Sequence, residues 1–204
     1  MVRCCSGVIL AGGRSSRFYG ADKAFFELGG LPMIRWITDL FCRIFPETML
    51  VTNDPLSHLK RDLSLFSDLF PTKSSLTGIH TGLFYAQTPW IFVGACDTPF
   101  IRKSVVELVL SEIGPGVSAV MPQTPSGMEP LCAAYSKEAL QAVERSVRQE
   151  KFKIQRVFKE LKVRKIPESR VMEADPELVS FFNVNTEADL KEARARLERK
   201  QSPG

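Results

Sequence analysis

Residues 10–24, LAGGRSSRFYGADKA, gather residue types that bind phosphate groups. Gly12 and Gly13 let backbone N–H groups approach phosphate oxygens, because neither residue has a Cβ that would clash. Arg17 and Lys23 can neutralise phosphate charge, the arginine through paired hydrogen bonds and the lysine as a point charge. The alternative is a surface loop whose cations face water. The composition of the loop favours binding of a triphosphate.

This loop differs from the two common glycine-rich nucleotide loops. A P-loop needs a glycine-lysine-serine/threonine triplet, and the loop sequence contains none. Gly12, Gly13 and Gly20 do not have the GxGxxG spacing of a dinucleotide-binding Rossmann domain. Asp22 precedes Lys23 and either orients its ammonium group or is a solvated loop acid. The sequence leaves these two interpretations open.

One carboxylate, Asp97, comes late in the most apolar segment of the chain, WIFVGACDTPFI (90–101). An acid is costly there unless it faces a cleft or binds a cation. A strand-end aspartate suits Mg²⁺, which takes carboxylate and phosphate oxygens. The alternative is an N-cap for a helix that begins near Pro99. Asn183 and Asn185 either complete such a site or form a turn and a helix cap.

The elements that must position these residues alternate along the chain. Strands are expected at 7–10, 48–53, 90–101, 117–122, 130–136 and 163–167, with a last edge segment at 180–185 and an ambiguous segment at 63–70. Helices are expected at 31–45, 77–87, 104–113, 137–161 with a break near Lys151, and 186–200 with Thr186 and Asp189 as its cap. This alternation predicts an α/β three-layer sandwich with a mainly parallel, Rossmann-like sheet. In such sheets ligands bind beyond the carboxyl ends of the strands, where polar loops follow Leu10, Thr52 and Cys96.

The composition is that of a globular protein, and we expect a single domain over residues 1–200 with a frayed tail at 201–204. The net charge of +4 is spread along 204 residues, which is poor evidence for nucleic-acid binding. The sequence has no apolar run long enough to span a membrane and no secretory signal, so we expect a cytoplasmic protein. Five cysteines without a repeated CxxC spacing, beside two histidines, favour free thiols over a zinc site.

Five blocks in order resemble those of the molybdenum cofactor guanylyltransferases, the MobA family, over nearly the whole chain. They are LAGGRSSRFYGADKAFFELGGLPMI, VTN (51–53), SSLTGIHTGL (74–83), GACDTPFI and FFNVNTEADL. The resemblance implies transfer of GMP from GTP to molybdenum-bound molybdopterin, with release of pyrophosphate and with Mg²⁺ as cofactor. It further implies that the protein works beside cofactor-inserting proteins and molybdoenzyme chaperones. From the charge and hydropathy patterns we expect no nucleic-acid or membrane partner.

The same resemblance assigns roles to individual residues. Catalysis would depend on Arg17, Lys23 and Asp97, with Asp97 as the ligand of Mg²⁺. The nucleotide- and cofactor-binding residues implied in this way are Leu10, Ala11, Gly12, Gly13, Lys23, Asn53, Asp68, Gly78, Gly82, Asp97, Asn183 and Asn185. The nucleophile is an anionic phosphate, so the reaction needs charge neutralisation and alignment, and no general base. The sequence departs from the family pattern at Phe18 and Tyr19, at Ser74 and Ser75 in place of Gly-Pro, and at Glu129 in place of a histidine that some relatives carry.

Rival functions are disfavoured by particular motifs. A cytidylyltransferase acting on the same cofactor resembles LAAG, not LAGG, in the first loop and usually lacks the run Cys-Asp-Thr-Pro. Enzymes that activate sugars or isoprenoid precursors are disfavoured by NVNTEADL. A non-catalytic nucleotide-binding protein would be expected to lose Lys23 or Asp97, and the sequence retains both.

Overall fold

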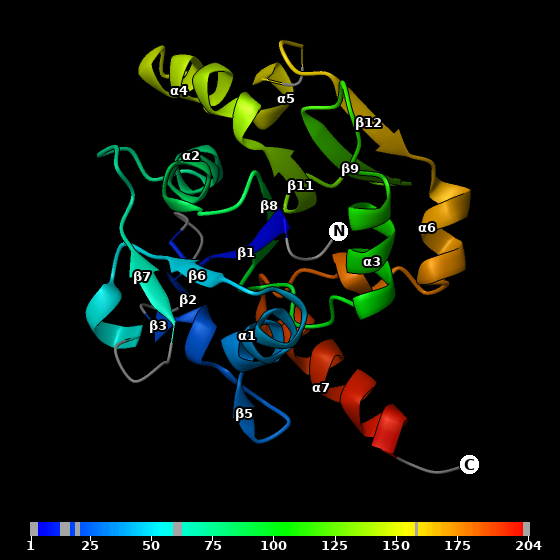
Figure 1. Ribbon diagram of the computed structural model, residues 1–204. Coiled ribbons are helices and arrows are strands. Elements are labelled where there is room, and N and C mark those ends of the chain that lie inside the picture. Colours follow the sequence, from blue (N-terminus) through cyan, green and yellow to red (C-terminus); the bar gives the residue numbers. More distant parts are fainter. Residues whose placement is uncertain (1–3, 13–16, 19–20, 59–62, 158, 202–204) are drawn as a thin grey trace.

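The computed structural model describes residues 4–12, 17–18, 21–58, 63–157 and 159–201 (Figure 1). Its eight-stranded sheet has the order β10–β9–β11–β8–β1–β6–β7, and β12 also pairs with β9. The strands are β1 (Cys5–Leu10), β6 (Thr48–Val51), β7 (Ser64–Phe66), β8 (Trp90–Ala95), β9 (Ala119–Thr124), β10 (Gly127–Met128), β11 (Cys132–Ser136) and β12 (Val163–Ile166). The pairs β1–β6, β1–β8, β6–β7 and β9–β12 are parallel, whereas β11 and β10 run antiparallel to their neighbours. The predicted mainly parallel sheet is confirmed.

Strand β8 lies in the middle of the sheet, between β11 and β1. Every residue of β8 and of β1 is buried. Strands covered on both faces read as continuous apolar runs, which is why WIFVGA could be recognised as central from its composition. The apolar run outlasts the strand, and Asp97 is the first charged residue beyond its carboxyl end.

Helices cover both faces of the sheet, and Figure 1 shows α1 and α3 on the side opposite α2 and α4. The first face carries α1 (Met33–Ile44), α3 (Lys103–Ser111) and α6 (Glu168–Ala174), and the second carries α2 (Ser75–Tyr85), α4 (Leu140–Arg148) and α5 (Ile154–Val157). Side chains alternate between the two apolar layers, so that Ile9 and Phe92 join the first layer while Val8 and Val93 join the second. This arrangement is the three-layer sandwich that the sequence predicts.

Two expectations about individual elements have different outcomes. The helical segment 137–161 is broken where expected, because α4 ends at Arg148 and α5 begins at Ile154. The expected edge strand at 180–185 is wrong. The 3-10 helix η5 (Val179–Phe181) occupies its first part, and the backbone N–H of Ser180 donates to the Asp175 carboxylate. The backbone N–H of Val184 donates to the Asp97 carbonyl, so these groups are not available for a strand ladder.

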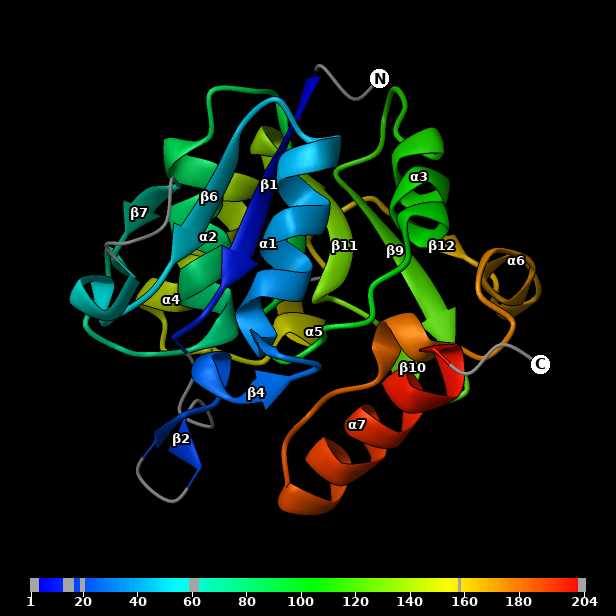
Figure 2. The same cartoon turned by 90° about the horizontal axis from the view of Figure 1, so that it is seen from below.

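Helix α7 (Glu187–Gln201) lies outside the three layers, beside β4 (Glu27–Leu28), as Figure 2 shows. Its Ala193 and Leu197 pack against Leu28 and Met33. The cap is the predicted one, since the Asp189 carboxylate accepts from Thr186 N–H at 2.7 Å and Asp189 N–H donates to Thr186 Oγ1 at 3.1 Å.

The remaining elements are short. They are β2 (Arg17–Phe18), β3 (Ala21–Asp22) and β5 (Leu31–Pro32), with the 3-10 helices η2 (Lys23–Phe25), η3 (Pro55–His58) and η4 (Lys137–Ala139). The ambiguous segment 63–70 contains β7 followed by a loop. None of the described helices combines the length and the apolarity that crossing a membrane requires.

Candidate active site

Three neighbouring parallel strands end at the same level, and a cleft of about 310 Å³ opens beyond them. Leu10 at the end of β1 is paired with Val51 of β6 and with Ala95 of β8. The chains stay together one residue further on, because Cys96 N–H donates to the Leu10 carbonyl at 3.0 Å and Ala11 N–H to the Val51 carbonyl at 2.9 Å. The loops that follow these strands therefore emerge side by side.

The cleft brings together residues that are far apart in the sequence. The expected site residues that line it are Leu10, Gly12, Lys23, Asp68, Gly78, Asp97 and Asn185. Lining residues outside that expected set are Val51, Lys73, Ser74, Ser75, Ala95, Cys96 and Leu131. Gly12 and Asp97 thus line one cavity, as the binding of a single nucleoside triphosphate between them requires.

Asp97 is held at the cleft by its place two residues after the end of β8. Its Oδ1 atom is buried and has no hydrogen-bond partner within the described ranges. Burial raises the pKa of the Asp97 carboxyl, and the Lys23 ammonium and the backbone N–H of Asp97 itself oppose that rise. The helix-cap alternative is wrong, because α3 begins at Lys103 and Arg102 is its cap residue.

Lys23 is a buried cation, with 4% of its surface exposed. The 3-10 helix η2 places it in the cleft, where Nζ donates to Asn185 Oδ1 at 2.9 Å. Asn185 comes from the segment before α7, whose cap is made by Thr186 and Asp189. Only the backbone N–H of Asn185 takes part in that cap, donating to Asp189 at 2.9 Å. The side chain of Asn185 therefore orients the lysine and does not terminate the helix.

A second polar group links the loops after β1, β6 and β7. Asn53 Nδ2 donates to Asp68 Oδ2 at 2.8 Å and to the Gly12 carbonyl at 3.3 Å. A Cβ at position 12 would lie 2.8 Å from Asn53 Nδ2, so any residue larger than glycine there would force the Asn53 amide to move. Burial raises the pKa of Asp68, against hydrogen bonds from Asn53 and Thr77 and against the charge of Lys73.

The amino-terminal turn of α2 forms another wall of the cleft. Ser74 Oγ accepts from Thr77 N–H at 3.1 Å, and Thr77 Oγ1 accepts from Ser74 N–H at 3.0 Å, which is a reciprocal capping box. Ser74 and Ser75, the departure from Gly-Pro, therefore start the helix in a regular way. A serine is a common N-cap residue, so Ser74 could have marked the start of α2, but the place of this turn in the cleft follows only from the tertiary structure.

Gly82 and Asn183 were expected at the site, and the structure does not bring either to this cleft. Gly82 lies on the face of α2 that touches the sheet, where a Cβ would come within 2.8 Å of Val8 Cγ1. Its role here is close packing of helix and sheet. Asn183 is exposed and donates through Nδ2 to the Phe181 carbonyl at 3.2 Å, which is the turn alternative.

Of three other expected site residues, Ala11, Gly13 and Arg17, the structure describes the side chain of Ala11 only. Ala11 is buried behind the cleft surface. Gly13 lies outside the described residues. Arg17 belongs to β2, and its side chain also lies outside the described part of the chain, as does that of Asp22.

A second hollow, of about 440 Å³, lies beside the segment that ends in Asn183. It is lined in part by Glu129, Phe182, Asn183 and Arg196. Glu129 Oε1 accepts from Thr124 Oγ1 at 2.7 Å, and burial raises the pKa of this carboxyl against that hydrogen bond. Val184, the next residue after Asn183, is bonded to the Asp97 carbonyl, so the hollow and the cleft share this segment.

The three-layer fold, with Gly12, Lys23 and Asp97 lining one cleft beyond the ends of the central strands, suits the binding of a nucleoside triphosphate. The family model of the MobA-like NTP transferase domain matches residues 7–165. A molybdenum cofactor guanylyltransferase from Desulfosudis oleivorans is 41% identical over 95% of this chain and 96% of its own length. A probable molybdenum cofactor guanylyltransferase from Natranaerobius thermophilus is 35% identical over 94% of this chain and 96% of its own length.

A solved structure agrees with these relatives. The crystal structure of molybdopterin-guanine dinucleotide biosynthesis protein A from Archaeoglobus fulgidus superposes with a TM-score of 0.84 at 29% identity, over 95% of this chain and 99% of that one. The chain belongs to the MobA-like NTP transferase family, and the family resemblance seen in the sequence is confirmed.

Proposed function

We propose that this protein transfers GMP from GTP to molybdenum-bound molybdopterin, which yields the guanine dinucleotide form of the molybdenum cofactor and pyrophosphate. The relatives named as molybdenum cofactor guanylyltransferases support this substrate pair. The observation that carries the proposal is the shared cavity of Gly12, Lys23 and Asp97 beyond the central strands. Backbone donors, a cation and a metal-type carboxylate are what a triphosphate needs there.

In the proposed reaction a terminal phosphate oxygen of the molybdopterin attacks the α-phosphorus of GTP. A new P–O bond forms, the bond to the β-phosphate breaks, and pyrophosphate leaves. Lys23, held by Asn185, would neutralise the charge of the triphosphate as it is displaced. We propose Arg17 as a second cation for this role. Gly12 would allow the backbone to contact the phosphates closely.

A magnesium ion fits the chemistry of Asp97. The buried Asp97 Oδ1 is an acceptor that finds no donor among the described residues, and a cation would satisfy it. In the part of the chain that is described, no group of three or more His, Cys, Asp and Glu side chains could hold a metal. Mg²⁺ is commonly held by one or two carboxylates together with substrate phosphates and water, so a single aspartate suffices. When bound, the ion would neutralise and orient the phosphates.

The base would be read by the polar group around Asp68. Guanine presents N–H donors on its pairing edge, and the Asp68 carboxylate in the cleft is an acceptor for them. Cytosine presents a ring acceptor at the equivalent place, which a carboxylate would repel. Asn53, which donates to Asp68 Oδ2, would fix the orientation of that carboxylate. We therefore propose Asn53 and Asp68 as nucleoside-binding residues, with Leu10, Ala11 and Gly78 around the nucleotide.

The second substrate has a candidate place in the second hollow. The hollow adjoins the cleft through Val184, whose N–H is bonded to the Asp97 carbonyl. Glu129 and Asn183 supply hydrogen-bonding groups there, and Arg196 lies over the Phe182 ring at 4.9 Å. We propose that the pterin binds in this hollow with its phosphate directed to the cleft.

The proposal is tested by the product formed from GTP and molybdenum-loaded molybdopterin, identified by mass, with pyrophosphate release measured in parallel. The wild-type protein should form the guanine dinucleotide, and Lys23→Ala and Asp97→Ala should not. The matched control is Asp39→Asn, which removes an exposed carboxylate paired with Arg35 on the outside of α1. It should leave turnover unchanged. A product formed from CTP and not from GTP would contradict the guanylyl assignment.

We propose in addition that residues 1–200 form one domain, with residues 201–204 outside it. We propose further that the protein acts in the cytoplasm, beside cofactor-inserting proteins and molybdoenzyme chaperones, as its resemblance to the MobA family implies.

A further inference from the structure

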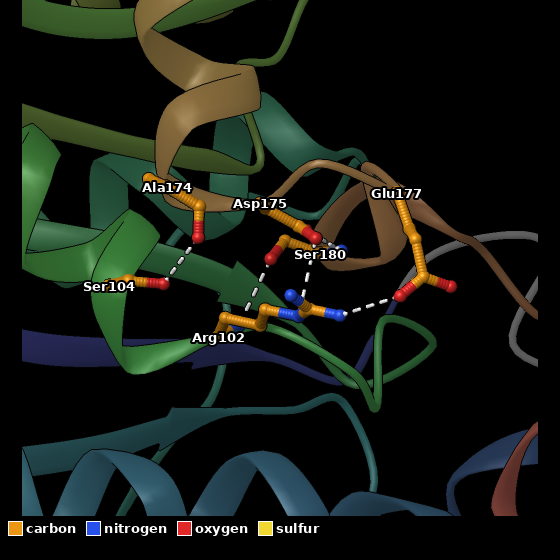
Figure 3. Close-up of polar contacts among 6 residues, drawn as sticks. All are labelled: Arg102, Ser104, Ala174, Asp175, Glu177 and Ser180. Atoms are coloured by element: carbon orange, nitrogen blue, oxygen red, sulfur yellow. Dashed lines mark hydrogen bonds and ion pairs between the residues drawn. The ribbon is translucent and has the colours of Figure 1, made fainter. Parts of the chain in front are cut away.

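Figure 3 shows a polar cluster around the buried Asp175, which joins Arg102 to Ser180. The segments that carry these two residues lead to Asp97 and to Asn185 in the active-site cleft. Asp175 is fully buried, with 0% of its surface exposed. Its Oδ1 lies 3.2 Å from Arg102 Nε, and its Oδ2 accepts from Ser180 N–H at 2.8 Å. The backbone N–H of Arg102 donates to Ser180 Oγ at 3.0 Å. The Asp175 carboxylate thus connects the segment 97–102, which follows Asp97, to the segment 180–185, which leads to Asn185.

The same two segments are fastened again next to the cleft. Val184 N–H donates to the Asp97 carbonyl at 2.8 Å. Asn185 follows directly, and its side chain accepts from Lys23 Nζ. The segments 97–102 and 180–185 are therefore held together at both ends, and the outer end depends on Asp175.

The contacts of Asp175 with Arg102 and Ser180 indicate that this carboxylate fixes the relative position of the two segments. A fully buried carboxylate is expensive to desolvate, and a well-packed apolar group would stabilise the fold as well or better. Here both carboxylate oxygens contact partners from the two segments, and Arg102 also contacts Glu177 at 3.2 Å. The cluster specifies one relative position of the segments, which apolar packing would specify less sharply.

We propose that Arg102, Asp175 and Ser180 are positioning residues of the active site. They hold the segment that carries Asn185 against the loop that carries Asp97, and thereby set the place of the Lys23 ammonium opposite that carboxylate. This inference rests on the proposed nucleotidyl transfer. A misplacement of about 1 Å at reacting groups can cost up to about 100-fold in rate, so the effect is measurable.

The test compares turnover in two backgrounds. Asp175→Asn keeps an acceptor for Ser180 N–H and removes the charge that holds Arg102. It should lower kcat for pyrophosphate release about 10- to 100-fold at a temperature well below its Tm. The double variant Asp175→Asn/Asn185→Ala should have the same kcat as Asn185→Ala alone, because the effect of Asp175 on Lys23 is transmitted through the Asn185 side chain. The effect of Asp175→Asn on the Tm should be equal in both backgrounds.

The matched control is Glu112→Gln. It breaks the ion pairs of Glu112 with Arg164 and Arg170, between the end of α3 and the neighbouring β12 and α6, and not on the segment that carries Asn185. It should leave kcat unchanged. If Asp175→Asn does not fold, Ser180→Ala serves in its place, because it removes only the hydroxyl that accepts from Arg102 N–H.

A readout independent of activity separates this inference from the proposed function. Amide hydrogen exchange should rise at residues 181–186 in Asp175→Asn relative to the wild type and to Glu112→Gln. If the wild type makes no dinucleotide, the proposed function fails, and exchange alone decides the positioning. Unchanged exchange in this segment would overturn the inference. An unchanged kcat, or equal losses of kcat in both Asn185 backgrounds, would overturn it as well.

Discussion

Replacing Gly12 with alanine should separate nucleotide binding from folding. The new Cβ would lie 2.8 Å from Asn53 Nδ2 and 3.3 Å from the Asn53 backbone nitrogen. The amide must therefore move away, and its 2.8 Å hydrogen bond to Asp68 is lost or lengthened. A hydrogen bond to a charged group contributes about 1.5–3 kcal/mol. Loss of that orientation should weaken GTP binding about 10- to 100-fold, at about 1.4 kcal/mol per factor of ten.

The assay is isothermal titration with GTP and Mg²⁺, with the Tm recorded for each variant. Asn53→Ala should weaken binding by a similar factor, and the double variant Gly12→Ala/Asn53→Ala should lose less affinity than the sum of the two single losses, because the clash with Asn53 Nδ2 is gone. Gly114→Ala is the control, since its Cβ would meet only Arg164 Nη1 at 3.7 Å. Wild-type affinity in Gly12→Ala, or fully additive losses in the double variant, would refute this reasoning.

Three further outcomes are expected. Burial raises the folded-state pKa of Asp97 and of Asp68 above the ordinary 3.8. The folded protein therefore binds more protons than the unfolded chain between these pKa values. The stability of the nucleotide-free protein should thus fall as pH rises from about 3.8 through the raised values. Asp97→Asn should flatten that decline in thermal unfolding, and an identical pH profile would contradict the assignment. Gly82→Ala should cost about 1–3 kcal/mol of unfolding free energy in urea titrations, because its Cβ would meet Val8 Cγ1 at 2.8 Å, while the affinity for GTP stays unchanged. GTP should raise the Tm only with Mg²⁺ present, and an equal rise with CTP would argue against the reading of the base by Asp68.

Local patterns were sufficient for the framework of the fold. The unbroken apolar run of β8 identifies a strand covered on both faces, and Asp97 stands out because it is the first charge after that run. The cap at Thr186 and Asp189 could be predicted because both partners lie within one helical turn. These patterns involve residues that are close together in the sequence, so they can be recognised before any long-range contact is known.

Other features depend on which distant segments meet. Gly82 matched a family position in the sequence, yet its neighbour is Val8 of β1 and not the cleft. The segment 180–185 has the composition of a strand, but its backbone groups bond to Asp175 and to the Asp97 carbonyl. The contact of Gly82 with Val8 and the bond of Val184 to the Asp97 carbonyl join residues far apart in the sequence, so no local pattern predicts them.

The amino-acid order alone determined the alternation of strands and helices, the glycine turn and the strand-end acid, since each follows from periodicity or residue type over a few positions. Tertiary structure alone decided that Lys23 is buried and bonded to Asn185, and that Asp175, indistinguishable by type from a solvated acid, is fully buried between two segments. The physical reason is that burial and pairing of a charged group are properties of its neighbours in space. Those neighbours are fixed only when the whole chain has packed.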